Sequence, residues 1–171
     1  MQVGFPRFLV MTVLSLVLAS CGGDWGPEDD GDGFGDRDTP VRTDVARLAL
    51  HQGTNNGTSA THERQVRFLP DQASYEDALL NYASDDSTAQ DVDFDVFQLL
   101  LIDMGTRSTG GYAIAVSDVY EEEGIVTAEL RYTYPESDCS VTDVETTPYL
   151  FLRLETQLPV VLSEEVSYTE C

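Results

Sequence analysis

The chain has 171 residues, 42% of them hydrophobic, and a formal net charge of −22. This size suits one compact domain with short appendages and is too small for two ordinary domains. Nine basic residues face 31 acidic ones, and every basic residue is an arginine. A chain this acidic lacks the basic surface that follows a phosphate backbone, so we expect no nucleic-acid partner.

Residues 1–20 predict an export signal. One basic residue, Arg7, precedes an apolar run from Phe8 to Ala19, which is too short to span a bilayer as a helix. The run ends in Leu18-Ala19-Ser20-Cys21, and small residues before a cysteine resemble the lipobox of bacterial lipoproteins. The resemblance implies that Cys21 becomes the diacylated, palmitate-bearing first residue of the mature chain. The alternative is an ordinary secretory signal with an unrelated cysteine.

Gly22 follows this cysteine, where many Gram-negative bacteria place an aspartate in lipoproteins held at the inner membrane. Similarity to that sorting rule favours a lipid-anchored protein of the cell envelope, at the outer membrane, on a face that the sequence leaves open. Two acyl chains give stable anchoring, whereas one gives only marginal binding.

Residues 21–44 predict the lipidated cysteine followed by an acidic flexible tether. From Gly22 to Asp44 there are eight acidic residues and two arginines but few apolar side chains. Such a segment cannot bury enough surface to offset the entropy of ordering it. Its expected span is roughly 25–30 Å. The aspartate- and glycine-rich stretch 30–38 is similar to a calcium loop but lacks the glutamate at position twelve, so we interpret it as a solvated spacer.

Residues 45–171 predict one β-rich domain. Alternating patterns over 45–51 and 65–69 predict two strands of a hairpin, with a turn at 53–58 that is rich in glycine and asparagine. Pro70 then stops the second strand. A short helix to Tyr82 is expected next, with Asp71 or Ser74 as its N-cap.

The second half of the domain predicts further strands. The apolar run within 96–104 is typical of a central strand buried on both faces. Residues 112–119 and 125–134 predict a hairpin, 149–154 a strand, and 160–168 a broken strand. One helix among about seven strands indicates an α+β domain that is mainly antiparallel β, either a sandwich or a half-closed barrel.

Two cysteines besides Cys21, namely Cys139 and Cys171, predict a disulfide in a compartment that permits one. The bridge would pin the C-terminus to the loop after the long hairpin. The alternative is two free thiols that are too far apart to pair.

No catalytic or metal-binding pattern emerges from the residue types. The only histidines are His51 and His62, and no second histidine follows His62-Glu63 at the spacing of a zinc protease. The chain has no lysine for a Schiff base and no Gly-x-Ser-x-Gly elbow. We therefore expect a protein that is not an enzyme and has no cofactor or metal.

One compact motif lies between two predicted strands, at Thr109-Gly110-Gly111-Tyr112. Paired glycines let a backbone turn tightly or approach another chain, and a tyrosine offers flat apolar area with a hydroxyl. Such a loop is either a binding site or a turn whose aromatic ring simply packs.

The sequence resembles the C-terminal domain of the PrcB family, named for an accessory subunit of a bacterial surface protease complex. The match extends over most of residues 60–165. It implies a non-catalytic lipoprotein that supports a partner, with a protease as the partner class. The matching motifs are Val92-Asp93-Phe94, Gly105, Thr109-Gly110-Gly111-Tyr112, Pro135, Cys139 and Thr147-Pro148-Tyr149.

Two alternatives stay open beside this resemblance. The Thr109–Tyr112 loop is similar to the Thr-Thr-Gly-Tyr loop of chagasin-type inhibitors of cysteine proteases, in which case Thr147-Pro148-Tyr149 would replace a missing second loop. A module that binds an envelope ligand is the other alternative. The residues expected to bind or to define the fold are Thr109, Gly110, Gly111, Tyr112, Pro148 and Tyr149.

Overall fold

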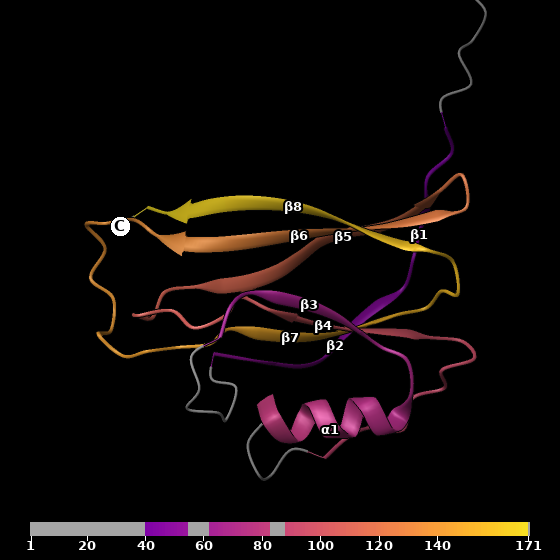
Figure 1. Cartoon of the computed structure of the whole chain (residues 1–171). Helices are drawn as coiled ribbons and strands as arrows, with labels where there is room; N and C mark the ends of the chain where they lie inside the picture. The colour runs from indigo at the N-terminus through magenta and orange to yellow at the C-terminus, as the bar shows by residue number, and fades with distance from the viewer. Residues whose placement is uncertain (1–39, 55–61, 83–87, 171) are drawn as a thin grey trace, which may run out of the picture. The chain divides into compact units, whose positions relative to one another are not determined.

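The computed structural model describes residues 40–54, 62–82 and 88–170, which fall in one compact unit. Two four-stranded sheets and the helix α1 (Gln72–Tyr82) make up this domain (Figure 1). The predicted signal sequence, Cys21, most of the tether, residues 55–58 of the predicted turn and Cys171 lie outside the described residues.

The first sheet, called sheet A, has the strand order β1-β5-β6-β8. Strands β1, β5 and β6 pair antiparallel, whereas β8 runs parallel to β6. Their bounds are Thr43–Asp44 for β1, Ala113–Glu122 for β5, Ile125–Pro135 for β6 and Val160–Thr169 for β8.

The second sheet, called sheet B, has the order β2-β7-β4-β3, and all its neighbours pair antiparallel. Their bounds are Arg47–Gly53 for β2, Gln65–Leu69 for β3, Gln98–Asp103 for β4 and Tyr149–Leu154 for β7. Strands β2 and β3 are therefore the two edges of this sheet.

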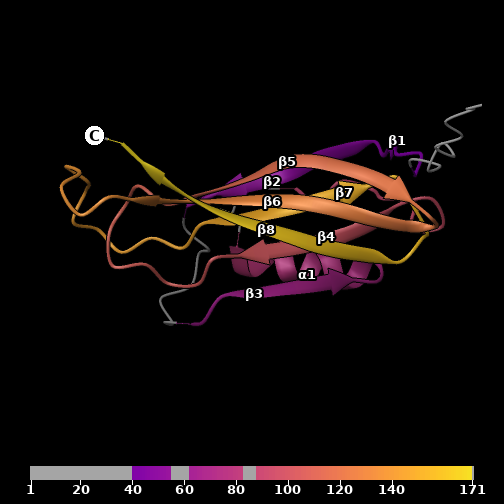
Figure 2. The same ribbon diagram turned by 90° about the horizontal axis from the view of Figure 1, so that it is seen from above.

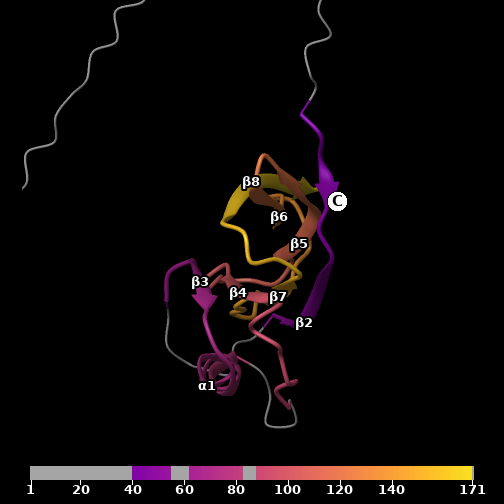
Figure 3. The same ribbon diagram turned by 90° about the vertical axis from the view of Figure 1, so that its right-hand side faces the viewer.

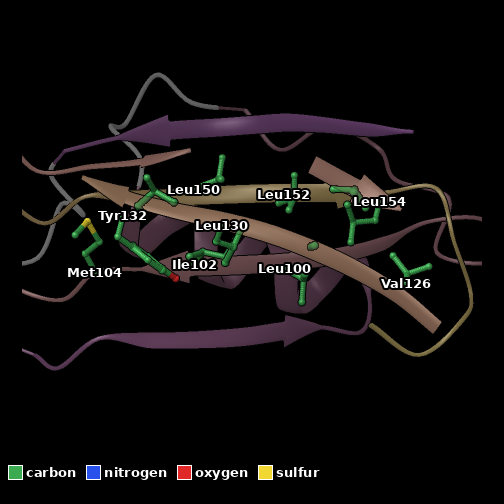
Figure 4. Packing of buried hydrophobic residues seen from close by; sticks show 12 residues of the cluster. Leu100, Ile102, Met104, Val126, Leu130, Tyr132, Leu150, Leu152 and Leu154 are labelled. Atoms are coloured by element: carbon green, nitrogen blue, oxygen red, sulfur yellow. The ribbon is translucent and has the colours of Figure 1, made fainter. Parts of the chain in front are cut away.

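Sheet B is the middle of three layers, with sheet A on one face and α1 on the other (Figure 3). This arrangement creates two apolar cores. The core between the sheets is shown in Figure 4, where nine buried residues are labelled: Leu100, Ile102, Met104, Val126, Leu130, Tyr132, Leu150, Leu152 and Leu154. The core under α1 includes Tyr75, Leu79, Tyr82, Leu99, Leu101 and Phe151.

Because both faces of sheet B are covered, the side chains of its two central strands are buried on both faces. Leu99 to Asp103 of β4 are all buried, and their side chains alternate between the two cores. The prediction of a central strand buried on both faces is confirmed. Strand β7 has the same character, because only Arg153 among its six residues is partly exposed.

The β5–β6 hairpin also follows its sequence pattern. The inward residues Val126, Ala128, Leu130 and Tyr132 are all at most 1% exposed. The two strands meet at Glu123 and Gly124, which both have positive φ, 54° and 80°. Two central residues of this kind form the mirror-image turn whose twist suits a tight hairpin.

The N-cap of α1 is Asp71, one of the two residues predicted. Its Oδ1 accepts a hydrogen bond of 2.7 Å from the backbone N–H of Ser74. Hydrogen bonds from the Ser74 side chain and from the Ser74 backbone N–H lower the pKa of the Asp71 carboxyl, because they favour its charged form.

Three sequence-based expectations are wrong. The strands predicted as a hairpin at 45–51 and 65–69 are β2 and β3, which share a sheet but lie at opposite edges. The apolar strands β4 and β7 occupy the centre between them, since only central strands are covered on both faces.

The predicted tether ends too late, because Thr43 and Asp44 form β1. The predicted broken strand is one continuous strand, β8. Of the two architectures predicted, the sheets form the sandwich, not a barrel.

Candidate functional site

The predicted Thr109–Tyr112 motif lies in the loop over residues 104–112, called here the signature loop, which joins the end of β4 to the start of β5. Arg107 and Thr146 form a two-way backbone bridge, with N–H to O distances of 2.8 and 2.9 Å. Gly110 donates its N–H to the carbonyl of Thr142 at 2.9 Å, and the carbonyl of Thr109 accepts the Thr146 hydroxyl at 2.8 Å. The signature loop is thus fastened to the segment that precedes β7.

Position 111 requires a glycine, because of its backbone conformation and because of the atoms around it. Its φ is +90°, and a Cβ there would lie 2.9 Å from Val141 Cγ1 and 3.1 Å from Pro135 Cβ. The next residue, Tyr112, is half-buried and packs edge-on against the ring of Tyr134, at 5.4 Å between centroids. Arg107 holds its guanidinium 5.5 Å from the centroid of each of these rings, within cation–π range.

Pro148 and Tyr149 have a different setting. Both are buried, and the Pro148 carbonyl accepts the backbone N–H of Met104 at 3.0 Å. The ring of Tyr149 belongs to the core under α1, 5.5 Å from the ring of Tyr82, and burial raises the pKa of its hydroxyl. Tyr112 packs against the other core, between the sheets.

The six predicted residues therefore do not form one surface. Thr109, Gly110, Gly111 and Tyr112 share one loop, whereas Pro148 and Tyr149 are built into the body of sheet B. A second inhibitory loop at 147–149 would need exposed side chains, and Thr147, Pro148 and Tyr149 are all buried.

Cys139 lies in the loop after β6, with its Sγ 3.3 Å from the carbonyl oxygen of Thr169. Thr169 is two residues before Cys171, which lies outside the described residues. The disulfide between Cys139 and Cys171 stays a prediction.

The structure also reveals a buried polar cluster around Asp103, which we did not predict. Asp103 is fully buried at the end of β4. Its Oδ2 lies 2.5 Å from His62 Nε2 and accepts the Tyr82 hydroxyl at 2.7 Å, while its Oδ1 accepts the backbone N–H of Gly105 at 2.7 Å. Gln65 donates to the Tyr82 hydroxyl at 2.9 Å. This carboxylate joins β3, α1 and the signature loop.

The electrostatics of this cluster favour a structural role. Burial raises the pKa of the Tyr82 hydroxyl, and its hydrogen bond to Asp103 raises it further, so the hydroxyl stays a donor. Buried carboxylates are tolerated when several donors surround them. The sequence signal was a single aspartate that ends the apolar run Leu99-Leu100-Leu101-Ile102, but nothing in the spacing identified its partners.

Gly105 couples the cluster to the chain that precedes β3. Its φ is +74°, and a Cβ would lie 2.6 Å from the backbone N of Arg64 and 2.8 Å from the carbonyl oxygen of His62. Thr106 donates its N–H to that same carbonyl at 3.0 Å, and its hydroxyl accepts the N–H of His62 at 3.1 Å. Only a residue without a side chain allows this approach.

Comparison with known protein families finds a match. Residues 99–155 match the family model described as PrcB C-terminal. This segment is therefore similar to the PrcB C-terminal family. It runs from β4 to the end of β7 and includes the signature loop, so it covers the centre of both sheets. The match is shorter than the resemblance over residues 60–165 that the motifs suggested.

No curated protein and no solved structure matches the chain. Within the described ranges, no helix is long and apolar enough to cross a membrane. The same residues hold no group of three histidine, cysteine or acidic side chains arranged to bind a metal ion.

Proposed function

We propose that this protein is a non-catalytic, lipid-anchored accessory subunit that binds a partner protein in the bacterial cell envelope, with a secreted or surface protease as the partner class. The observation that carries this proposal is the PrcB C-terminal match over residues 99–155. The PrcB family, which the sequence motifs resemble, is named for an accessory subunit of a protease complex. An accessory domain of this kind is compatible with a protein that is not an enzyme.

The anchor rests on the sequence alone. Cys21 follows an apolar run that is too short to span a bilayer, and two acyl chains would hold the domain stably at the outer membrane. The acidic segment after Cys21 would separate the domain from the lipid surface by roughly 25–30 Å.

Purification from native membranes tests the proposal. The full chain with a C-terminal tag would be extracted in detergent, purified, and compared with the Cys21→Ala variant by quantitative mass spectrometry of the co-eluting proteins. We expect a secreted or surface protease to be enriched with the wild-type chain and depleted with the variant.

Deleting the gene provides the matched control. If the protein supports a protease, the level or activity of that protease in the membrane fraction falls in the deletion strain and returns when the gene is restored. A protease that neither co-elutes nor changes in the deletion strain would contradict the proposal.

A further inference from the structure

One side of the sandwich, called here the open side, is formed by β2 of sheet B and β5 of sheet A (Figure 2). The incoming chain covers only part of it. Strand β1 pairs with β5 at Tyr120 and Glu121, and Val45 then donates its N–H to the carbonyl of Val119 at 3.0 Å. The chain next crosses to sheet B, where Ala46 accepts from Glu155 at 2.9 Å. In the described part of the chain, no strand covers the outer edge of β5 from Ala113 to Asp118.

A cleft of about 350 Å³ is lined by residues of β2, β5 and β7. Its lining is mostly apolar and includes Leu48, Ile114 and Val116, together with the core residues Leu150 and Leu152. Ala49 also lines it, on β2 between Arg47 and Gln52, and its single methyl group leaves the space open. The cleft therefore reaches from the surface to the core between the sheets.

Two polar side chains span the cleft to the backbone of β5. Gln52 Nε2 donates to the carbonyl of Ile114 at 3.0 Å, and Arg47 Nη2 donates to the carbonyl of Ser117 at 3.1 Å. Both carbonyls belong to the stretch of β5 whose outer edge no described strand pairs. Both donors belong to side chains that can move aside. The β5 carbonyls therefore have hydrogen-bond partners that the backbone of an incoming strand could replace.

We propose that this cleft docks an extended segment of a partner protein, which adds to the free edge of β5 and inserts alternate apolar side chains between the sheets. Strand addition of this kind draws affinity from main-chain hydrogen bonds and specificity from pockets for alternate side chains. The inference rests on the proposed function, since it requires that the domain binds a protein.

Charge selects the occupant. The chain carries a net charge of −22, so a second copy would be repelled, whereas a segment bearing lysine or arginine would be attracted. The rim of the cleft is electrically balanced, because Arg47 lies 3.5 Å from Asp118. Because the rim itself is balanced, the preference for a basic occupant comes from the net charge of the whole chain. The occupant is an extended segment that alternates small apolar residues, which enter the cleft, with basic residues, which face outward.

The edge of β8 is a weaker candidate. It exposes Val166 and Tyr168, but the space between it and sheet B is filled by Tyr132 and spanned by Arg64, which pairs with Glu164. A partner there would meet backbone without a recess for its side chains.

Nuclear magnetic resonance of the ¹⁵N-labelled mature chain tests the docking site with a defined probe. The probe is a synthetic peptide of alternating valine and lysine, about eight residues long, which matches an ordinary strand. We expect the amide signals of Leu48, Ile114 and Val116 to shift on titration, while that of Val166 on β8 does not. The same peptide with glutamate in place of lysine should bind about tenfold more weakly or worse.

Two changes separate strand addition from surface adhesion. Methylating alternate backbone nitrogens of the probe removes its main-chain donors without touching the protein, and this should abolish the shifts. Ala49→Phe fills the cleft and should weaken binding at least about tenfold, whereas Ala73→Phe on the exposed face of α1 should leave binding unchanged.

Shifts centred on β8, or equal binding of the methylated peptide, would overturn the docking site. That result would leave the proposed function standing if the protease still co-purifies with the full chain. Conversely, binding at the cleft without any co-purifying protease would support the docking site and contradict the proposed partner class.

Discussion

The two sides of the sandwich close in different ways. On the side formed by β3 and β8, called here the sealed side, Arg64 stacks over the ring of Tyr132 at 4.3 Å and pairs with Glu164, and the Tyr132 hydroxyl lies 3.1 Å from the same glutamate. On the open side, among the described residues, the side chains of Arg47 and Gln52 reach from β2 to backbone carbonyls of β5. The first arrangement fills the space between the sheets, and the second leaves the cleft.

The two sides differ in the role of the side chains that lie between the sheets. Tyr132 is 1% exposed, and burial raises the pKa of its hydroxyl to about 12, so the ring is part of the core. Gln52 and Arg47 instead cap backbone carbonyls that a strand could take over. A sandwich can thus be stable along one edge and receptive along the other.

The largest expected effect is at the sealed side. Tyr132→Ala removes a fully buried aromatic ring and should lower the free energy of unfolding by about 3–5 kcal/mol. The matched change on the open side is Val116→Ala, which should cost about 1 kcal/mol because Val116 is half-buried beside an existing cleft. Urea denaturation measures both, and equal losses would contradict the contrast between the sides.

The Asp103 cluster holds the edge strand β3 and should rank next. Asp103→Asn keeps the volume but replaces one acceptor oxygen with a donor, which leaves the Tyr82 hydroxyl or the Gly105 N–H without its partner. We expect a loss of about 2–4 kcal/mol in the free energy of unfolding. Gln65→Ala removes a 3.5 Å contact to Asp103 and a 2.9 Å hydrogen bond to the Tyr82 hydroxyl but leaves the carboxylate in place, so it serves as the milder comparison. A neutral effect of Asp103→Asn would show that the cluster does not anchor β3.

Gly105→Ala should cost about 2–3 kcal/mol, because its Cβ would meet the backbone of residues 62–64 and its φ of +74° is unfavourable for alanine. Gly124 has a similar φ of +80° with nothing within 4 Å of the added Cβ. Gly124→Ala should therefore lower the free energy of unfolding by only about 1 kcal/mol. Equal melting temperatures for the two variants would exclude the close approach as the reason for Gly105.

On the open side, Gln52→Ala should change the free energy of unfolding by about 1 kcal/mol or less, since water can replace the lost donor at a half-open cleft. Calorimetry of this variant checks the claim that the β2 to β5 contacts are replaceable. A loss as large as that of Asp103→Asn would mean that this edge is as firmly closed as the other.

The smallest effect concerns pH. His51 of β2 packs between the rings of Tyr75 and Phe151, and burial lowers its pKa below the ordinary 6.5. The unfolded chain therefore takes up a proton first as the pH falls below about 6.5, and the folded state loses stability there. Because the imidazole is partly exposed, screening keeps the loss below about 1 kcal/mol. Urea midpoints at pH 7.5 and 5.5 should differ less in His51→Phe than in the wild-type chain. An equal difference between the two midpoints in both proteins would exclude His51 as a cause.

Local patterns predicted the parts of this fold that local chemistry decides. The apolar run of β4, the alternation of β6 and the Asp71 cap each follow from residues close together in sequence. Strand order could not be predicted in the same way, because β2 and β3 reached their edges through competition with β4 and β7 for the centre. Similarly, the partners of Asp103 come from positions 62, 82 and 105, and no periodicity links them.

The predicted site shows the same limit. The Thr109–Tyr112 loop was recognisable from its glycines, but its contacts with the segment before β7 depend on long-range pairing. Pro148 and Tyr149 matched the family motif and nevertheless lie in the interior of the domain. The cleft between β2 and β5 left no sequence signal beyond the small side chain of Ala49.

Site-specific photo-cross-linking in the native envelope tests the central claim most directly. Leu48 on β2 and Phe68 on β3 are apolar residues of the two edge strands, with 46% and 54% of their surface exposed. Each would be replaced in turn by a benzophenone amino acid in the full chain. The account predicts an adduct with another protein from position 48 and none from position 68. An adduct from position 68 alone would contradict it.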